Sequence, residues 1–294
     1  MLPERESPLQ QLSGPAGIRL YLKRDDRLHP QVSGNKWRKL KYNLIAARQQ
    51  QHHTLLTFGG AYSNHLFATA AAGKLAGFNT IGIVRGDEHR ERDTPTLAFA
   101  RSCGMNLYFV SRADYRLKDT SEFTSRLETR FGRFYRLPEG GSNVLAVQGV
   151  AEVMPEIEHQ LGRIPDYVCC PVGTGGTLAG LVAGASEPTQ VLGFSALKGG
   201  SFLIDDVNRL LPADLPVKPF QLLTDYHFGG YAKTTPELFR FMHEFERQTG
   251  VLIEQVYTGK MLFGLFDLAR QGYFPIGATV VALHTGGLQG RLPG

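Results

Sequence analysis

The sequence predicts an α/β fold, in which strands and helices alternate along the chain. Three mainly apolar runs, at residues 167–172, 190–197 and 278–284, are typical of strands that are buried on both faces of a parallel sheet. Segments of helical character separate these runs from one another and from further short apolar runs. Because parallel strands are joined by crossover connections, the alternation favours sheets whose faces are covered by helices.

The other elements are expected in order along the chain. "TLLTF" (54–58) is a short apolar strand that ends at two glycines, and "SNHLFATAAAGKLAGF" (63–78) is a helix with small and apolar residues on one side. Further strands are expected at residues 80–84, 106–110 and 133–137, and further helices at residues 236–249 and 260–271.

The composition is ordinary for a soluble globular protein, with 42% apolar and 20% charged residues in 294. No apolar run approaches the roughly 18 residues that a membrane-spanning helix needs, and the first ten residues are too polar for a signal peptide. The three cysteines, Cys103, Cys169 and Cys170, lack the spacing of a disulfide framework, and the adjacent pair is expected in the core. These features predict a cytoplasmic protein that does not bind membranes.

The net charge of +5 raises the question of nucleic-acid binding. Outside residues 36–41, however, basic residues are scattered and acids are usually nearby, and no basic motif is interleaved with aromatic residues. A positive balance suits an anionic small molecule equally well, so we expect no nucleic-acid partner.

The segment "SGNKWRKL" (33–40) places one lysine on the apolar side of an expected helix. If the helix begins near Asn35, an arc of about 100° contains Lys36, Trp37, Leu40, Leu44 and Ala47. Three other basic residues fall outside this arc and are expected to reach water: Arg38, Lys39 and Lys41. Lys36 either extends its amine to water from the edge of the apolar stripe or is desolvated, with a lowered pKa that would allow it to form a Schiff base.

The strongest local signal is "PVGTGGTLAGL" (171–181), where a buried strand leads through a glycine-rich turn into a helix. Backbone N–H groups in such a turn can converge on an anion, and the helix N-terminus adds a favourable dipole. The pattern is neither a dinucleotide fingerprint nor a P-loop, because Leu178 takes the third glycine position and no Gly-Lys-Ser/Thr follows. It predicts a phosphate site, and the alternative is a turn that only allows close packing. The residues of this loop are Gly173, Thr174, Gly175, Gly176 and Thr177.

Polar residues also occur at other expected strand ends, where open α/β sheets bind ligands. In "FGGAYSNH" (58–65), one of Ser63 and Asn64 is expected to cap the following helix while the other points into a cleft. Tyr257 and Thr258 precede a helix expected to begin near residues 259–260. Further candidates are Thr285, in a strand end, and Tyr231, in a glycine-flanked loop.

The sequence contains neither the ligands of a zinc site nor the nucleophile motif of a serine hydrolase. His52 and His53 have neither the spacing nor the partners of a zinc site, so no metal is expected. No G-x-S-x-G nucleophile elbow is present.

A candidate lysine and a separate phosphate site together fit pyridoxal phosphate, and the sequence resembles a family that uses this cofactor. It is similar to the tryptophan-synthase-β-like (fold type II) pyridoxal-phosphate enzymes, and among them to the 1-aminocyclopropane-1-carboxylate deaminase/D-cysteine desulfhydrase group. The motifs that carry the resemblance occur in the family's order: "LKRDDR" (22–27), "SGNKWRKL" (33–40), "GGAYSNH" (59–65), "PEGGSN" (138–143), "GTGGT" (173–177), "VYTGK" (256–260) and "HTGG" (284–287).

The resemblance implies two open, twisted, mostly parallel sheets flanked by helices. It implies a small α/β domain at residues 39–146, inserted into a large cofactor-binding domain formed by residues 1–38 and 147–294, and a homodimer.

The resemblance also implies roles for single residues. Lys36 would hold pyridoxal 5'-phosphate as a Schiff base and later move the substrate's Cα proton, and residues 173–177 would bind the phosphate. Asn64 would contact the pyridoxal 3'-oxygen, and Ser63 and Asn64 with His65 would meet the substrate carboxylate. Tyr231 and Tyr257 would line the substrate side of the ring, and Thr258 and Thr285 would lie near the pyridine nitrogen.

The threonines at positions 258 and 285 separate the two activities of the group. The deaminase branch has an acid in place of Thr258 and a leucine in place of Thr285. A carboxylate would keep the pyridine nitrogen protonated, as cyclopropane opening requires, whereas a hydroxyl suffices for β-elimination. The resemblance therefore implies a D-cysteine desulfhydrase-like lyase that forms pyruvate, sulfide and ammonia.

Other functions remain possible for this sequence, and two of its motifs differ from the family pattern. The alternatives are a 1-aminocyclopropane-1-carboxylate deaminase, which forms 2-oxobutanoate and ammonia, and a protein without enzymatic activity, either a degenerate member of the family or a basic nucleic-acid-binding protein. The sequence departs from the family pattern at Tyr62, where many relatives have glutamine, and at "EQVY" (254–257), where "DPVY" is more usual.

Overall fold

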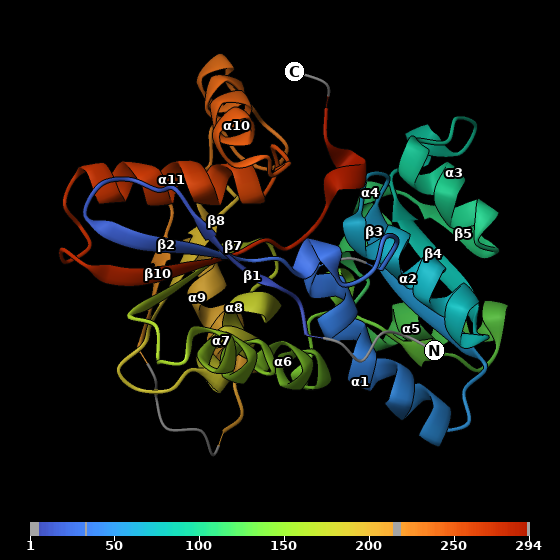
Figure 1. Cartoon of the computed structure of the whole chain (residues 1–294). Helices are drawn as coiled ribbons and strands as arrows, with labels where there is room; N and C mark the ends of the chain where they lie inside the picture. Colours follow the sequence, from blue (N-terminus) through green and yellow to red (C-terminus); the bar gives the residue numbers. More distant parts are fainter. Residues whose placement is uncertain (1–5, 33, 214–218, 293–294) are drawn as a thin grey trace.

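Two separate β-sheets form the framework of the protein (Figure 1). The computed structural model describes residues 6–32, 34–213 and 219–292. The large sheet has the strand order β1-β2-β10-β7-β8-β9, and the small sheet has the order β5-β4-β3-β6. Within the described parts of the chain, β1 and β2 pair antiparallel and the other paired strands run parallel. The predicted α/β fold with two mostly parallel sheets is confirmed.

The strands that the sequence predicted are present close to the expected runs, whereas β1, β2 and β9 were not predicted. The large sheet consists of β1 (Leu9–Leu12), β2 (Ile18–Lys23), β7 (Tyr167–Val172), β8 (Gln190–Ser195), β9 (Phe220–Leu223) and β10 (Ala278–Leu283). The small sheet consists of β3 (Thr54–Gly60), β4 (Asn79–Arg85), β5 (Met105–Val110) and β6 (Tyr135–Arg136). The strand expected at residues 133–137 is only two residues long, because it pairs with β3 at two positions alone.

Helices cover both sheets. Around the small sheet lie α1 (Asn35–Gln49), α2 (Asn64–Ala76), α3 (Pro95–Ser102), α4 (Arg112–Arg116) and α5 (Ser121–Phe131). Around the large sheet lie α6 (Val144–Ala151), α7 (Val153–Leu161), α8 (Gly176–Gly184), α9 (Leu203–Leu210), α10 (Pro236–Thr249) and α11 (Thr258–Arg270). The helix expected at residues 260–271 begins two residues earlier, at Thr258.

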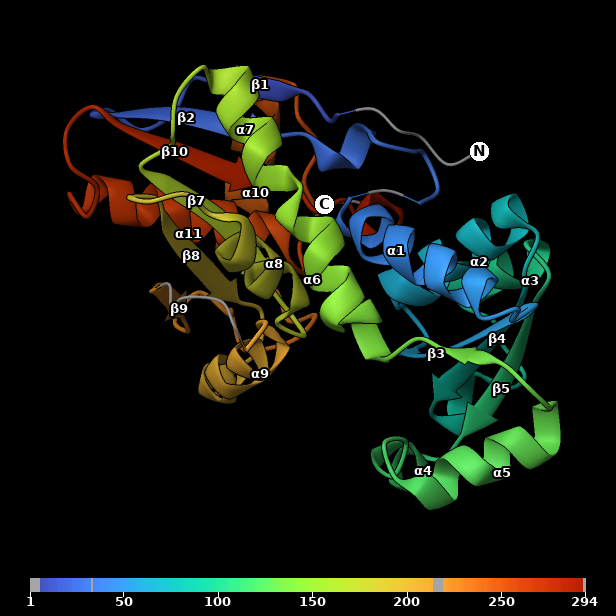
Figure 2. The ribbon, with the colours of Figure 1, turned by 90° about the horizontal axis from the view of Figure 1, so that it is seen from below.

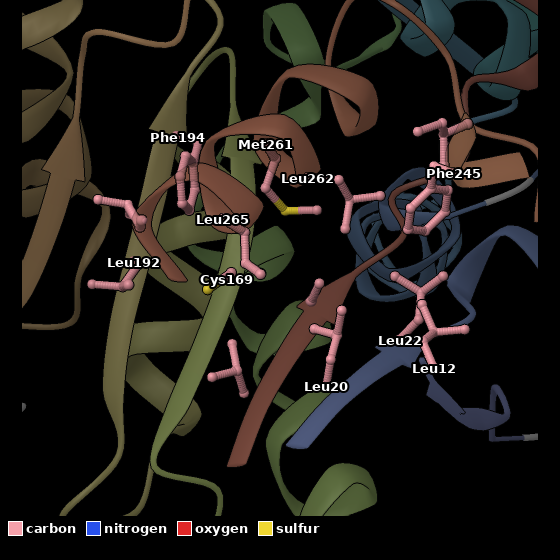
Figure 3. Close-up of a cluster of buried hydrophobic side chains, with 14 of the residues drawn as sticks. Leu12, Leu20, Leu22, Cys169, Leu192, Phe194, Phe245, Met261, Leu262 and Leu265 are labelled. Atoms are coloured by element: carbon pink, nitrogen blue, oxygen red, sulfur yellow. The ribbon is translucent and has the colours of Figure 1, made fainter. Parts of the chain in front are cut away.

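The large sheet is buried on both faces. One face packs against α10 and α11 through a cluster that includes Leu20, Leu22, Met261 and Leu265 (Figure 3). The other face packs against α6, α7, α8 and α9 through a second cluster. Because side chains alternate along a strand, the adjacent cysteines enter different clusters, Cys169 the first and Cys170 the second. Both are fully buried and unpaired, so the prediction that they belong to the core is confirmed.

The two sheets lie in two lobes, with α1 and α6 between them (Figures 1 and 2). All strands of the small sheet fall within residues 54–136, and those of the large sheet fall outside this range. The predicted domain boundaries at residues 38/39 and 146/147 lie inside α1 and α6, which pack against each other. In the described residues, no helix combines the length and the hydropathy that crossing a membrane requires.

Helix α1 corrects one prediction about the basic segment. The predicted apolar face is confirmed, since Trp37, Leu40, Leu44 and Ala47 are buried. Arg38 and Lys39, which were expected to reach water, are only 3% and 2% exposed, whereas Lys36 is half-buried. The reason is that α1 lies between the two lobes, so more than one of its faces is covered.

Candidate active site

A cavity of about 630 Å³ lies where strands of both sheets reach their carboxyl ends. Its wall includes Gly60 at the end of β3, Arg85 at the end of β4 and Val172 at the end of β7. Thr285 contributes from the residues just after β10. A volume of this size accommodates a cofactor together with a small substrate.

Most of the predicted site residues meet in this cavity, although they come from distant parts of the sequence. Those that line it are Lys36, Ser63, Asn64, His65, Gly173, Thr174, Gly175, Thr177, Tyr231, Tyr257 and Thr285. Gly176 and Thr258 are not part of its wall. Ser33, the first residue of the predicted lysine motif, lies outside the described residues.

Lys36 is the second residue of α1 and lines the cavity. Desolvation lowers the pKa of this amine to about 8. In the described part of the chain, no carboxylate forms an ion pair with Lys36 that would restore its usual pKa. The arrangement therefore gives a larger share of neutral, nucleophilic amine near neutral pH than an ordinary lysine would have.

Gly34 is the N-cap residue of α1 and makes a very close approach to the residues after β10. Gly34 has φ 65° and ψ −150°, a conformation that is open almost only to glycine. A Cβ atom here would overlap the carbonyl oxygen of Thr285. The glycine of "SGNK" thus sets the distance between Lys36 and the end of β10.

The glycine-rich loop between β7 and α8 has the geometry of an anion site. Gly175 has φ 77° and precedes the first residue of α8, Gly176. A Cβ atom on Gly176 would lie 3.0 Å from Nζ of Lys39 and would overlap the Ser142 hydroxyl. The absence of a side chain thus leaves the helix N-terminus open toward a cation and a hydroxyl, as a phosphate requires.

Lys39 was missed by the sequence prediction, which placed it in water. Its Nζ donates hydrogen bonds to the Gly140 carbonyl oxygen (3.1 Å) and to the Ser142 hydroxyl (3.0 Å). The same hydroxyl lies 2.7 Å from that of Thr174 in the glycine-rich loop. Burial, and then repulsion from Lys36, hold the pKa of Lys39 well below its usual value. Its position three residues after Lys36 was the available signal, because residues i and i+3 are neighbours on a helix.

Ser63 and Asn64 divide their roles in one of the two expected ways. Ser63 is the N-cap of α2, and its Oγ accepts a hydrogen bond from the Leu66 amide (3.2 Å). Asn64 is the first residue of the helix, lines the cavity and accepts a bond from the Gln289 side chain through Oδ1 (2.6 Å). The amides of the first turn of α2 thus face the cavity, where they can receive a carboxylate.

His65 has one ring nitrogen that lacks a partner. Its Nε2 lies 2.8 Å from the Thr57 hydroxyl, which donates its only proton to the Leu137 carbonyl oxygen (3.1 Å). Nε2 must therefore donate, and Nδ1 is left as a buried acceptor without a hydrogen-bond partner. Burial, followed by repulsion from Lys36 and Lys39, lowers the pKa of His65 well below its usual value. The imidazole is thus neutral, and Nδ1 suits a donor rather than a carboxylate.

Tyr231 and Tyr257 form a pair at one wall of the cavity. Their ring centroids are 6.1 Å apart in a T-shaped arrangement. Burial, together with the neighbouring Tyr231 hydroxyl, raises the pKa of Tyr257 well above its usual value, and burial also raises that of Tyr231. Both phenols are therefore protonated at neutral pH and can donate a hydrogen bond or a proton.

The hydroxyl of Thr258 is directed to Glu254 instead of the cavity. It accepts a hydrogen bond from the Glu254 amide (3.1 Å) and lies 3.1 Å from Glu254 Oε1. The buried Glu254 carboxylate also accepts bonds from the amides of Val256 (2.7 Å) and Thr258 (2.6 Å) and so caps α11. Of the two threonines expected near a pyridine nitrogen, only Thr285 belongs to the cavity wall.

Charged residues that the sequence prediction did not single out line the outer part of the cavity. They are Arg85, Glu88, Arg112 and Glu139. Glu88 pairs with Arg112, and Glu139 lies 3.5 Å from Lys118. The described residues contain no cluster of three or more histidine, cysteine or acidic side chains that could hold a metal ion.

Comparison with known proteins identifies the class to which this site belongs. The sequence matches the family described as "Pyridoxal-phosphate dependent enzyme" over residues 1–286, and the chain belongs to this family. It is an enzyme that uses pyridoxal phosphate. The lysine amine and the anion site in one cavity fit this cofactor.

Individual relatives cover nearly the whole chain. A putative 1-aminocyclopropane-1-carboxylate deaminase of Pyrococcus furiosus is 33% identical over 97% of this chain and 90% of its own. A bifunctional mitochondrial D-cysteine desulfhydrase/1-aminocyclopropane-1-carboxylate deaminase of Arabidopsis thaliana is 32% identical over 94% of this chain and 74% of its own. A D-cysteine desulfhydrase of Serratia proteamaculans is 28% identical over 95% of this chain and 89% of its own.

The structures agree with this family. The crystal structure of an ACC deaminase homologue superposes with a TM-score of 0.83 and 31% identity, over 99% of this chain and 92% of the other. An O-ureido-L-serine synthase, with a TM-score of 0.71 and 14% identity over 96% of this chain and 90% of its own, shows the same fold.

Proposed function

We propose that the protein is a lyase that converts D-cysteine and water into pyruvate, sulfide and ammonia. The relatives named above support an activity on small amino acids, since their names describe D-cysteine desulfhydrases and 1-aminocyclopropane-1-carboxylate deaminases. The cofactor supplies the electron sink that stabilises a carbanion at Cα. The residues of the cavity bind the cofactor and substrate and move protons.

The cofactor would be held at two points. Lys36 would bind its aldehyde carbon, because its amine is exposed to the cavity and has a lowered pKa. The glycine-rich loop of residues 173–177 would bind the phosphate through backbone amides at the start of α8. Lys39 places its amine at the same point, 3.0 Å from the position that a Cβ of Gly176 would occupy, where a bound phosphate would favour the protonated form.

The substrate would lie between α2 and the tyrosine pair. The first-turn amides of α2, at residues 64 and 65, would bind its carboxylate, with Asn64 nearest the cofactor ring. Lys36 would remove the Cα proton, because it lines the cavity and its amine has a lowered pKa. Tyr231 and Tyr257 would donate a proton to the departing thiolate, since both phenols are protonated and face the cavity.

The preference for β-elimination rests on one observation, namely that no carboxylate is found at positions 258 or 285. Thr285, in the cavity wall, offers a hydroxyl at the place where the pyridine nitrogen is expected. Glu254 is buried outside the wall, and its carboxylate is already engaged by amides of α11. A hydroxyl beside the pyridine nitrogen is sufficient for β-elimination when the leaving group is a thiolate.

The alternative is 1-aminocyclopropane-1-carboxylate deamination, which the names of several relatives favour. It would release 2-oxobutanoate and ammonia. Thr258 argues against this activity, because it replaces the acid of the deaminase branch.

The first test is an absorption spectrum of the purified protein before and after addition of D-cysteine, with pyruvate and sulfide measured. We expect a visible band from bound cofactor, a change of this band with D-cysteine, and both products in equal amounts. Lys36→Ala is expected to abolish product formation, whereas the matched change of an exposed lysine, Lys74→Ala, is expected to leave it intact.

Two other outcomes would contradict the proposed activity on D-cysteine. Release of 2-oxobutanoate from 1-aminocyclopropane-1-carboxylate, without products from D-cysteine, would establish the deaminase instead. A visible band without either product would keep the cofactor and exclude both substrates.

We also propose a cytoplasmic homodimer that binds neither membranes nor nucleic acid, with the domain boundaries given above. The composition and the absence of a basic nucleic-acid motif support the location and the partners, and the resemblance supports the dimer.

A further inference from the structure

The loop that brings Tyr231 to the cavity has a strained backbone. Four of its residues have positive φ angles, and two of these are not glycine: Phe228 at 51° and Ala232 at 56°. The glycines between them, Gly229 and Gly230, have φ angles of 94° and 122°. Residues with side chains adopt such angles only when surrounding contacts hold them there.

Lys260 provides contacts of this kind. It is the third residue of α11, and its side chain is 1% exposed. Its Nζ donates hydrogen bonds to the carbonyl oxygens of His227 (2.9 Å) and Gly230 (2.8 Å). The same two carbonyls close the turns of the loop, since they accept bonds from the amides of Gly230 (3.0 Å) and Lys233 (3.1 Å).

Burial of the charged amine of Lys260 is energetically unfavourable. In the described residues no carboxylate lies within ion-pair distance of it, and burial lowers its pKa to about 8, against a smaller opposing effect of Glu254. A buried lysine that lacks an ionic partner is rare unless it serves a role, because desolvation of the charge is unfavourable.

We propose that Lys260 is a positioning residue that fixes the Tyr231 loop against Tyr257. Helix α11 carries Lys260, and Tyr257 is its N-cap, so one element holds both tyrosines at the spacing seen in the cavity. The catalytic consequence rests on the proposed role of Tyr231, whereas the structural consequence does not.

The structural test is amide hydrogen exchange in Lys260→Met, a variant of similar length that cannot donate. We expect the amides of Gly230 and Lys233 to exchange at least about tenfold faster than in the wild type, because their acceptor carbonyls lose the second bond that holds the loop. The matched control is Lys233→Met, which changes an exposed lysine of the same loop and should leave exchange unchanged. Unchanged exchange in Lys260→Met would overturn the proposal.

The catalytic test is a double-mutant cycle between Lys260→Met and Tyr231→Phe. Misplacement of Tyr231 by about 1 Å should lower kcat by up to about 100-fold, with KM for D-cysteine and the cofactor absorbance little changed. In the Tyr231→Phe background, Lys260→Met should have almost no further effect on kcat. Equal effects in both backgrounds would show a general structural role and would refute the positioning role.

The two tests separate the two proposals. If the wild type acts on neither amino acid, the proposed function fails, and hydrogen exchange still decides the role of Lys260. If Lys260→Met does not fold, Lys260→Gln, which keeps a donor but has a shorter side chain, serves in both tests and should show the same direction of change.

Discussion

Two lysines one turn apart on α1 perform different tasks because their surroundings differ. Lys39 is tied by hydrogen bonds to Gly140 and Ser142 beside the glycine-rich loop, so its amine is held at the anion site. Lys36 has no such bonds among the described residues, and desolvation lowers its pKa to about 8. Lys39 is thus suited to holding a phosphate, and Lys36 is suited to reacting as an amine.

The lowered pKa of Lys36 predicts how cofactor loading depends on pH. Only the neutral amine forms a Schiff base, so loading of the cofactor-free protein should become faster as pH rises and should level off above about pH 8. The measurement is the rate at which visible absorbance appears after pyridoxal phosphate is mixed with the apoprotein between pH 6.5 and 9.5. A rate that still rises steeply at the upper end, as an ordinary lysine would give, would contradict the lowered pKa.

At the scale of elements, the start of α1 is placed by a glycine rather than by a capping side chain. Gly34 is the N-cap residue and makes no side-chain cap, and its backbone approaches Thr285 too closely for any other residue. The helix that carries Lys36 is therefore set directly against the end of β10, which belongs to the large sheet.

Gly34→Ala should displace this helix. We expect a loss of about 3 kcal/mol or more in the free energy of unfolding, from the forbidden conformation and the overlap with Thr285 together, and a loss of the visible cofactor band. The matched control is Gly77→Ala at the end of α2, where φ is 74° and a Cβ atom meets nothing within 4 Å. That change should cost only about 1 kcal/mol and should keep the band.

Urea unfolding and absorption spectra of the two variants make this comparison. Equal stability and equal cofactor binding in Gly34→Ala and Gly77→Ala would show that the close approach of α1 to Thr285 has no consequence.

At the scale of the whole molecule, a buried network of charges ties α1 to the large lobe. Arg38 bonds to Asp25 (3.0 Å) and to Glu156 on α7, and Lys23 at the end of β2 lies 2.9 Å from Glu156. Ser7 donates a further bond to Asp25 (2.6 Å). Two charged residues of the "LKRDDR" motif, Lys23 and Asp25, thus belong to this network, and no residue of the motif lines the cavity.

The network predicts sensitivity to acid. Burial opposes ionisation of Glu156, but the hydrogen bonds and charges of Arg38 and Lys23 outweigh it and lower the pKa of Glu156 below its usual 4.5. Because the folded pKa is the lower one, the stability contributed by Glu156 is fully present above about pH 4.5 and is lost as pH falls through the folded value. Glu156→Gln should therefore cost about 3–5 kcal/mol at pH 7 and less under acid conditions.

Urea unfolding at pH 7 and near pH 3.5 tests this prediction, with Glu152→Gln as the control. Glu152 pairs with Lys41 at the surface, where both side chains are about one-third exposed, and its loss should cost at most about 1 kcal/mol. Similar costs for the two variants would mean that the buried network contributes no more than a surface pair.

The sequence by itself determined the class of fold, and it named most of the predicted residues that the fold brings together in the cavity. Alternation of apolar strands with helices is a local property, and so is the positive φ angle that Gly175 adopts in the turn between β7 and α8. Lys36 could be singled out because a helical period places it beside the apolar stripe. The order of the motifs then gave the family, which the comparisons confirmed.

Only the tertiary structure decided which groups meet and which faces are covered. The periodicity of α1 identified one buried face, but Arg38 and Lys39 are buried as well, because the helix lies between two lobes. The competition between Ser63 and Asn64 for the cap, and the use of the Thr258 hydroxyl by Glu254, depend on hydrogen-bond geometry that spacing does not encode. The hydrogen bonds of Lys260 to the Tyr231 loop join residues about thirty positions apart, and such contacts form only when the whole chain has folded.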